Sequence, residues 1–336
     1  MSVATVSRFL NGGLRLPPAT AQRIERAIQA LDYRPNSQAR RLSLGRSETI
    51  GLVVPEIDNP FFARLADAVE LAAEQRGLGV LLCITRNQPR RELDYLALLR
   101  SKQVDGLLFL TNRWDTRALT RSINTLRHVV VVDEDVRDAR VPKVFVENEA
   151  GGALAGEVLV RAGHRRVAFV GGPERMLSTT ERLAGFRRAL GAAGAEIVHL
   201  GHEDYTRAGG ARAAEALLAA GSAATGVFLA SDAATCGFLG VLAARRLTVP
   251  RDLSVVSFDD VEPLGLFAPP VTAIRQPVAE IGRHAVALLM SQIAGDAPRD
   301  APVLRLPVEL VTRASVAAPR RDASATGRTP PRGTAR

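Results

Sequence analysis

The pattern of side chains in residues 3–11 predicts a short helix with one apolar and one polar face. The apolar side chains of Val6, Phe9 and Leu10 share one face. Small and hydrogen-bonding side chains share the opposite face at spacings of three and four residues, namely Ala4, Ser7, Arg8 and Asn11. Small residues let a helix approach the DNA major groove closely, and an arginine can hold a guanine through two hydrogen bonds. An ordinary amphipathic surface helix has the same pattern, so spacing alone leaves both interpretations open.

Polar and aromatic side chains also follow the predicted strands. Asp58 and Asn59 come after the apolar run 49–55 and precede Pro60, which suits the start of a helix. Asp232 and Asp259 come directly after two more apolar runs. In open α/β sheets the carboxyl ends of the strands bind ligands. Each of these polar residues could instead cap a helix. Phe61 and Phe62, which follow Pro60, could contact a ligand or belong to the core.

Motifs that would indicate catalysis are absent from the sequence. It contains no GxGxxG, P-loop, GxSxG or HExxH motif. The five histidines are scattered, and Cys83 and Cys236 show no spacing typical of a metal site. We therefore expect no metal, no cofactor and no enzymatic activity.

The elements that position these residues alternate between strand and helix from residue 49 onward. Parallel sheets with helices on both faces follow from this alternation. About ten predicted strands are too many for one sheet, so we expect two doubly wound α/β lobes that meet near Asn148 and Gln276. The predicted strands cover 49–55, 79–85, 104–111, 129–133, 144–147, 166–171, 197–201, 225–231 and 253–259. The clearest predicted helices cover 61–76, 90–102, 180–193 and 208–220.

Short helices are predicted before this body, which makes the head all-α. Ser2 is a candidate cap for the helix at residues 3–11, and a second helix starts near Pro18 and runs to Leu31. Asn36 is placed to cap a third helix at 37–44. The final residues, 317–336, are rich in Pro, Gly, Ser and Arg and are expected to be disordered.

The net charge of +9 is concentrated at the two ends of the 336-residue chain. Residues 1–46 carry +6, residues 317–336 carry +4 and the body carries −1. Such a distribution indicates that an end contacts a polyanion. No apolar run is long enough to span a membrane and no secretory signal is visible. Together with the sparse cysteines, this predicts a cytoplasmic protein.

Three stretches give the chain its resemblance to a known family. SVATVSRFLNG, RIERAIQALDYRPNSQARRL and ETIGLVVPEIDNPFF resemble the start of LacI/GalR-family transcriptional regulators, and the resemblance extends to about residue 316. It implies a helix-turn-helix head at 1–34 and a periplasmic-binding-protein-like body at 47–316. The residues in base-reading positions are Val3, Ala4 and Arg8. Those in phosphate-facing positions are Thr5, Ser7 and Asn11.

The resemblance also assigns residues 35–46 as a hinge helix. Leu42 matches the side chain that enters the minor groove at the dimer axis and opens a base step. Arg40 would lie near phosphate, Ala39 would allow close approach, and Asn36 would cap the helix. A homodimer bound to a palindromic operator follows from two-fold symmetry. A linker with solvated arginines is the structural alternative.

An effector site between the lobes is implied as well, with closure of the lobes controlling operator binding. Most relatives sense sugars, with purines and nucleosides a minority, so the expected function is a sugar-controlled repressor. Whether the effector releases DNA or promotes binding stays open. The effector-facing positions are Asn59, Phe61, Phe62, Arg182 in RLAGF, Tyr205, Asp232 and Asp259 in SFDD.

The chain departs from the family at its start. Family members carry roughly 15 residues before this point, which form the first helix of the motif, so we expect the native chain to begin upstream of Met1. Two alternatives to a regulator share the two-lobed body. One is an extracytoplasmic sugar-binding protein, disfavoured by the recognition and hinge segments. The other is a sugar-binding protein derived from such a regulator that no longer binds DNA.

Overall fold

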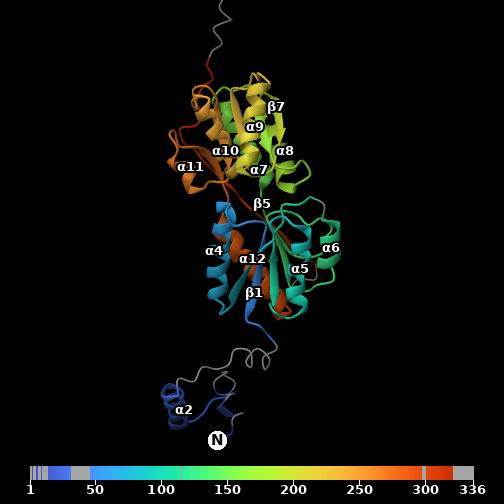
Figure 1. The fold of residues 1–336 in the computed structure, drawn as a ribbon, viewed down its shortest axis with the longest axis vertical. Helices are drawn as coiled ribbons and strands as arrows, with labels where there is room; N and C mark the ends of the chain where they lie inside the picture. Colours follow the sequence, from blue (N-terminus) through green and yellow to red (C-terminus); the bar gives the residue numbers. More distant parts are fainter. Residues whose placement is uncertain are drawn as a thin grey trace, which may run out of the picture.

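The computed structural model describes residues 2, 5, 6, 9, 14–31, 46–114, 116–296 and 300–320. From residue 46 onward these form two α/β lobes stacked along the long axis of the molecule (Figure 1). Each lobe is built on a six-stranded sheet with helices on both faces. The two doubly wound lobes predicted from the sequence are therefore confirmed.

The sheet of the first lobe has the strand order β11-β5-β4-β3-β1-β2, and all its pairings are parallel. Its strands are β1 (Thr49–Val54), β2 (Gly79–Ile84), β3 (Gly106–Phe109), β4 (Val129–Val132), β5 (Lys143–Val146) and β11 (Val303–Leu306). Its helices are α4 (Pro60–Glu74), α5 (Pro89–Arg100), α6 (Arg117–Ile123) and α12 (Val278–Ala294). Helices α4 and α12 pack side by side on one face.

The second lobe repeats this arrangement in the order β12-β10-β9-β8-β6-β7, with only β12 antiparallel to its neighbour. Its strands are β6 (Arg166–Gly171), β7 (Glu196–His202), β8 (Gly226–Leu229), β9 (Ser254–Phe258), β10 (Thr272–Arg275) and β12 (Glu309–Val311). Its helices are α7 (Asn148–Arg161), α8 (Leu177–Ala192), α9 (Arg207–Ala219), α10 (Asp232–Ala244) and α11 (Glu262–Leu266). Helix α7 packs against α8, and α9 packs against α10.

Burial explains why the central strands form where the sequence is uniformly apolar. Strand β4 is four consecutive valines, all buried, because helices cover both faces of a parallel sheet. The edge strands β2 and β7 are more exposed, with Leu81, Leu82 and Leu200 each about 40% accessible to solvent. An unbroken apolar run such as that of β4 is typical of a strand buried on both faces, which is why this strand is predicted from the sequence.

The chain passes between the lobes three times. It leaves the first lobe after β5, returns between β10 and α12, and crosses a third time at residues 307–308 between β11 and β12. The crossings near Asn148 and Gln276 are those predicted from the sequence. The third has no sequence signal, because β11 and β12 are short and partly exposed. Three closely spaced connections allow the lobes to rotate about a hinge.

Within the head, the described residues include helix α2 (Pro18–Ala30), which begins at a proline and buries Ile24. Leu31, the predicted end of this helix, lies just beyond its last residue and is exposed. The backbone N–H of Thr5 donates to the Ser2 hydroxyl at 3.2 Å, the contact expected of a helix cap. The hinge segment predicted at 35–46 lies outside the described residues, apart from Arg46.

Candidate functional site

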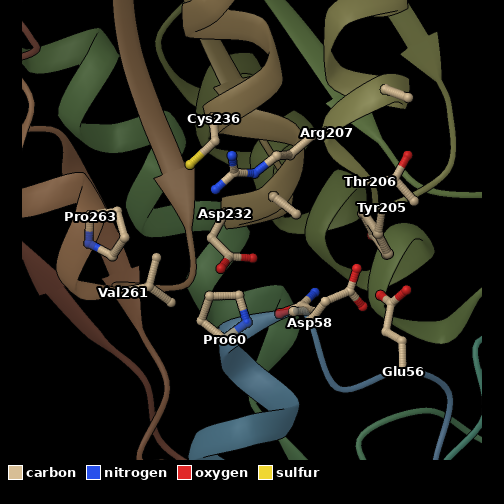
Figure 2. A pocket seen from close by; sticks show the side chains of 13 residues that line it. Glu56, Asp58, Pro60, Tyr205, Thr206, Arg207, Asp232, Cys236, Val261 and Pro263 are labelled. Atoms are coloured by element: carbon tan, nitrogen blue, oxygen red, sulfur yellow. The ribbon is translucent and has the colours of Figure 1, made fainter. Parts of the chain in front are cut away.

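Two adjoining pockets open where the strands of both sheets end. The inner pocket, of about 30 Å³, is lined by Asn59, Phe62, Asn112, Asp133, Glu134, Met176, Ser178, Arg182, Tyr205, Ser231, Asp259 and Gln276. The outer pocket, of about 280 Å³, is lined by Glu56, Asp58, Asn59, Pro60, Tyr205, Thr206, Arg207, Ala208, Asp232, Ala233, Cys236, Val261 and Pro263 (Figure 2). Both pockets take residues from both lobes, and together they are called the cleft below. The inner pocket has room for one or two waters, so a larger ligand requires the lobes to move apart.

Arg182 is the central cation of the inner pocket. Its Nε donates to Asn148 Oδ1 at 2.8 Å, and its Nη1 donates to the carbonyl oxygen of Ala230 at 2.6 Å. The guanidinium also lies 3.5 Å from the centre of the Phe258 ring, a close cation–π contact. These three contacts hold the buried side chain in one position, which prepares it to bind a ligand without a loss of side-chain entropy.

The residues around Arg182 in the RLAGF segment explain how α8 is positioned. A Cβ atom on Gly185 would lie 1.8 Å from the carbonyl oxygen of Glu149 in α7, so only glycine allows the two helices to pack this closely. Phe186 points into the core and is fully buried. One short segment therefore sets the helix packing and directs Arg182 into the cleft.

Two aspartates at strand ends adopt unusual backbone conformations. Asp133 follows β4 with φ of 71°, and Asp259 follows β9 with φ of 67°. Residues other than glycine seldom adopt this left-handed region, and such strained positions cluster at functional sites. The carboxylate of Asp259 accepts a hydrogen bond from Gln276 Nε2 at 2.5 Å. The strained turns aim both carboxyls at the cleft.

Burial shifts the titration of the carboxyl groups in the cleft. It raises the pKa of Asp133 to about 6 and, with the nearby Asp259, the pKa of Asp232 to about 7. Burial and then the neighbouring Asp133 raise the pKa of Glu134 to about 8. The pKa of Asp259 is raised by burial too, although Arg182 opposes the shift. Burial therefore disfavours the ionised form of several carboxyl groups in the cleft, as expected for a binding site.

Tyr205 lies at the junction of the two pockets, and its ring and hydroxyl are both held. The hydroxyl lies 2.8 Å from Thr179 Oγ1 and 3.4 Å from Ser178 Oγ on α8. A Cβ atom on Gly172 would collide with the ring at 2.6 Å, so the glycine makes room for it. The ring is placed to cover one face of a ligand.

The loop before α4 contributes Asn59, whose side chain caps the helix by accepting a hydrogen bond from the N–H of Phe61 at 2.9 Å. Phe61 and Phe62 are both buried and contact each other edge to face at 5.2 Å. Phe62 lines the inner pocket, whereas Phe61 lines neither pocket and packs in the core. The structure thus brings six of the seven predicted effector residues to the cleft.

Glu134 reaches across the cleft from the first lobe to the second. Its carboxylate accepts hydrogen bonds from the backbone N–H groups of Leu177 and Ser178, at 3.0 Å and 3.2 Å. These groups begin α8, whose own N-cap residue, Met176, offers no side-chain cap. A carboxylate is favourable at a helix N-terminus because it pairs with free N–H groups and with the helix dipole. Glu134 therefore joins the lobes.

Several residues of the cleft are not among those predicted from the sequence. Asp133 ends a predicted strand, so the strand-end rule that selected Asp232 and Asp259 could also have found it. The sequence around Glu134 does not indicate a role in the cleft, because that role depends on a contact with the other lobe. Other missed lining residues are Glu56, Asn112, Ser178, Arg207 and Gln276.

Most of the predicted DNA contacts fall outside the described residues. Thr5 is described as helical. Residues 3, 4, 7, 8 and 11 of the recognition segment, and residues 36, 39, 40 and 42 of the hinge, are not described. Their roles stay predictions.

Known proteins match both parts of this chain. Residues 1–36 match a family described as bacterial regulatory proteins of the lacI family, and residues 157–316 match a periplasmic binding protein-like domain. The HTH-type transcriptional repressor CytR of Escherichia coli (strain K12) is 33% identical over 297 residues, which cover 88% of this chain and 87% of CytR. The chain belongs to the LacI family. It is therefore a DNA-binding transcriptional regulator and not an enzyme, as the sequence predicted.

Solved structures of family members show the same fold. A complex of the transcriptional regulator CelR with cellobiose has a TM-score of 0.74 and 32% identity, covering 94% of this chain and 96% of CelR. The lac repressor dimer bound to operator and the anti-inducer ONPF has a TM-score of 0.84 and 26% identity, covering 95% and 96%. Among the residues that the structure describes here, no helix is long and apolar enough to cross a membrane.

Proposed function

We propose that this LacI-family regulator is a homodimeric repressor whose affinity for a palindromic operator is set by a sugar bound in the cleft. The observation that carries the proposal is the buried polar network of the cleft, where Arg182 from α8, Tyr205 from the loop after β7 and Asp259 from the end of β9 converge. An arginine, acids and a covering aromatic ring are suited to sugar hydroxyl groups. The structural relative CelR, in complex with cellobiose, supports the same class of ligand.

DNA binding and effector binding would take place in different parts of the regulator. In the head, Val3, Ala4 and Arg8 would read bases while Thr5 and Ser7 would hold phosphates. The hinge at 35–46 would lie in the minor groove, with Leu42 inserted. Residues 47–316 would form the sensing and dimerisation unit of a cytoplasmic protein. Asn148 and Gln276 lie where the chain crosses between lobes and bond to Arg182 and Asp259, so ligand contacts there would change the lobe angle.

A titration of the full chain on an immobilised operator tests this function. A sugar that binds the cleft is expected to change operator affinity by about 5- to 150-fold, the usual range of coupling between two sites. Arg8→Ala is expected to weaken operator binding by ~1–3 kcal/mol and relax its base preference, while leaving sugar affinity unchanged. Sugar binding without any operator binding would instead support a sugar-binding protein that no longer recognises DNA.

A further inference from the structure

Two buried acceptor atoms of the cleft have no hydrogen-bond partner among the described residues. They are Asp232 Oδ1 and Gln276 Oε1. Asp232 is 1% exposed and lines the outer pocket, and Gln276 is 5% exposed and lines the inner pocket. An unpaired buried acceptor costs about 1–3 kcal/mol, so both atoms are suited to receive hydrogen bonds from a ligand.

The charge of the cleft restricts what such a ligand can be. Six carboxyl groups line the two pockets against two arginines. The carboxyl groups belong to Glu56, Asp58, Asp133, Glu134, Asp232 and Asp259. Arg182 is already bonded to Asn148 and to the Ala230 carbonyl and stacked on Phe258. A negatively charged ligand would add one more anion to a buried cluster that already resists ionisation.

Among the described residues that line the outer pocket, the cation is Arg207, and it is exposed. An exposed guanidinium keeps its hydration and contributes little to an ion pair, about 0–1 kcal/mol. Asp232 is buried in the same pocket, and its carboxylate points toward Pro60 of the first lobe (Figure 2). The buried acid therefore has more influence on a ligand in this pocket than the exposed arginine.

We propose that the effector carries hydroxyl groups and no negative charge, and that an amino group on it is bound at Asp232 in preference to a hydroxyl. This inference rests on the proposed sugar-sensing function. A protonated amine donates to the unpaired Oδ1 and also neutralises a buried carboxylate, whereas a hydroxyl only donates. Neutral sugars bind more weakly than their amino forms, and phosphorylated or acidic sugars bind more weakly than neutral ones.

Calorimetric titration of the full chain with matched series of hexoses tests the ranking. Each series contains the neutral sugar, its amino derivative and its phosphate ester, for example D-glucose, D-glucosamine and D-glucose 6-phosphate. In the series that binds, we expect the amine to bind at least about tenfold more tightly than the neutral sugar, and the ester at least about tenfold more weakly. A phosphate ester that binds as tightly as the neutral sugar overturns this inference alone. If no sugar binds in any form, the proposed sugar effector is wrong as well.

Asp232→Asn tests the position of the amino group. The variant keeps the shape of the side chain but not its charge, so the preference for the amine over the neutral sugar is expected to fall to about twofold or less. Because this is a ratio of two affinities for the same variant, loss of folded protein does not affect it. Asp204→Asn is the matched control, since Asp204 is exposed and lines neither pocket. An unchanged ratio in Asp232→Asn overturns the assignment.

Discussion

In the second lobe, the polar side chains of the cleft are held by neighbours from the same lobe. Arg182 is bonded to Asn148 and Ala230, and the Tyr205 hydroxyl lies against Thr179. In the first lobe, Glu134 instead makes its hydrogen bonds across the cleft to α8. Arg64 likewise donates to the Asp260 carbonyl oxygen of the second lobe, at 3.0 Å. The second lobe is thus a preorganised binding surface, and the first lobe closes on it.

This difference predicts that substitutions in the second lobe affect affinity most strongly. Arg182→Ala removes a buried cation with three fixed contacts and leaves the acids of the cleft without their counter-charge. We expect effector binding to weaken by about 3 kcal/mol, or roughly 100-fold, measured by calorimetric titration. Arg187→Ala, an exposed arginine on the same helix, is the control and should have no effect. If Arg182→Ala stays folded and binds within threefold of wild type, the second lobe is not the main binding surface.

The carboxyl groups of the cleft predict a pH dependence of stability. Asp232 titrates near 3.8 when unfolded and at about 7 when folded, so the folded state binds more protons between these values. Its contribution to stability is therefore present below about pH 4 and is lost as the pH rises to about 7. In Asp232→Asn, the pH dependence of the free energy of unfolding should change by up to about 1.4 kcal/mol per pH unit in this range.

Chemical denaturation at several pH values measures this slope. Asp204→Asn, which changes an exposed acid, should leave the slope as it is in wild type. Equal slopes for Asp232→Asn and wild type would show that Asp232 is ionised in the folded state at all these pH values. The second lobe would then be less strongly desolvated than its burial indicates.

Contacts between the lobes should have a smaller effect, on closure more than on binding. Glu134→Gln removes the charge that caps α8, a contact of about 0.5–2 kcal/mol. Since the pKa of Glu134 is raised to about 8, the effect should be largest near pH 9, where the side chain is ionised. Small-angle X-ray scattering of the ligand-free protein should then show a more open shape. Glu174→Gln, an exposed acid next to α8, is the control, and equal opening in both variants would contradict the role of Glu134.

The difference between the lobes also decides which cleft residues can be predicted from the sequence. Asp232 and Asp259 are predicted because they follow apolar strands, and Asp259 and Arg182 also because they lie in segments that resemble the family. Their positions depend on local structure within one lobe. Glu134 was missed because its partner, the start of α8, is more than 40 residues away and belongs to the other lobe. A single sequence gives no signal for such a contact.

The strands that were not predicted, and the position of Phe61, have a similar physical explanation. Strands β10, β11 and β12 were not predicted. Each of β11 and β12 has at most one buried residue, so neither shows the unbroken apolar run of a central strand. These two strands are held by pairing with β5 and β10, which lie far away in the sequence. Strand β10 is buried but has only four residues, of which Thr272 and Arg275 are polar. Phe61 is expected at the effector because it follows the loop that the family resemblance places at the cleft, whereas the structure packs it in the core beside Phe62.

The smallest effect is expected from the contact between Trp114 of the first lobe and Arg175 of the second. The guanidinium lies 4.9 Å from the centre of the indole ring, and the ring is about half exposed, so the cation–π contact is worth about 0.5–1 kcal/mol. A double-mutant cycle with Trp114→Ala and Arg175→Ala should give this coupling in the free energy of closure, measured by fluorescence transfer between dyes on the two lobes. If the lobes close through Glu134 and Arg64 alone, the coupling is zero, and closure is controlled from within the cleft. A coupling near 1 kcal/mol instead means that the contact between Trp114 and Arg175 also favours the closed form of the ligand-free protein. Such a contact lowers the affinity of ligands that must first open the cleft.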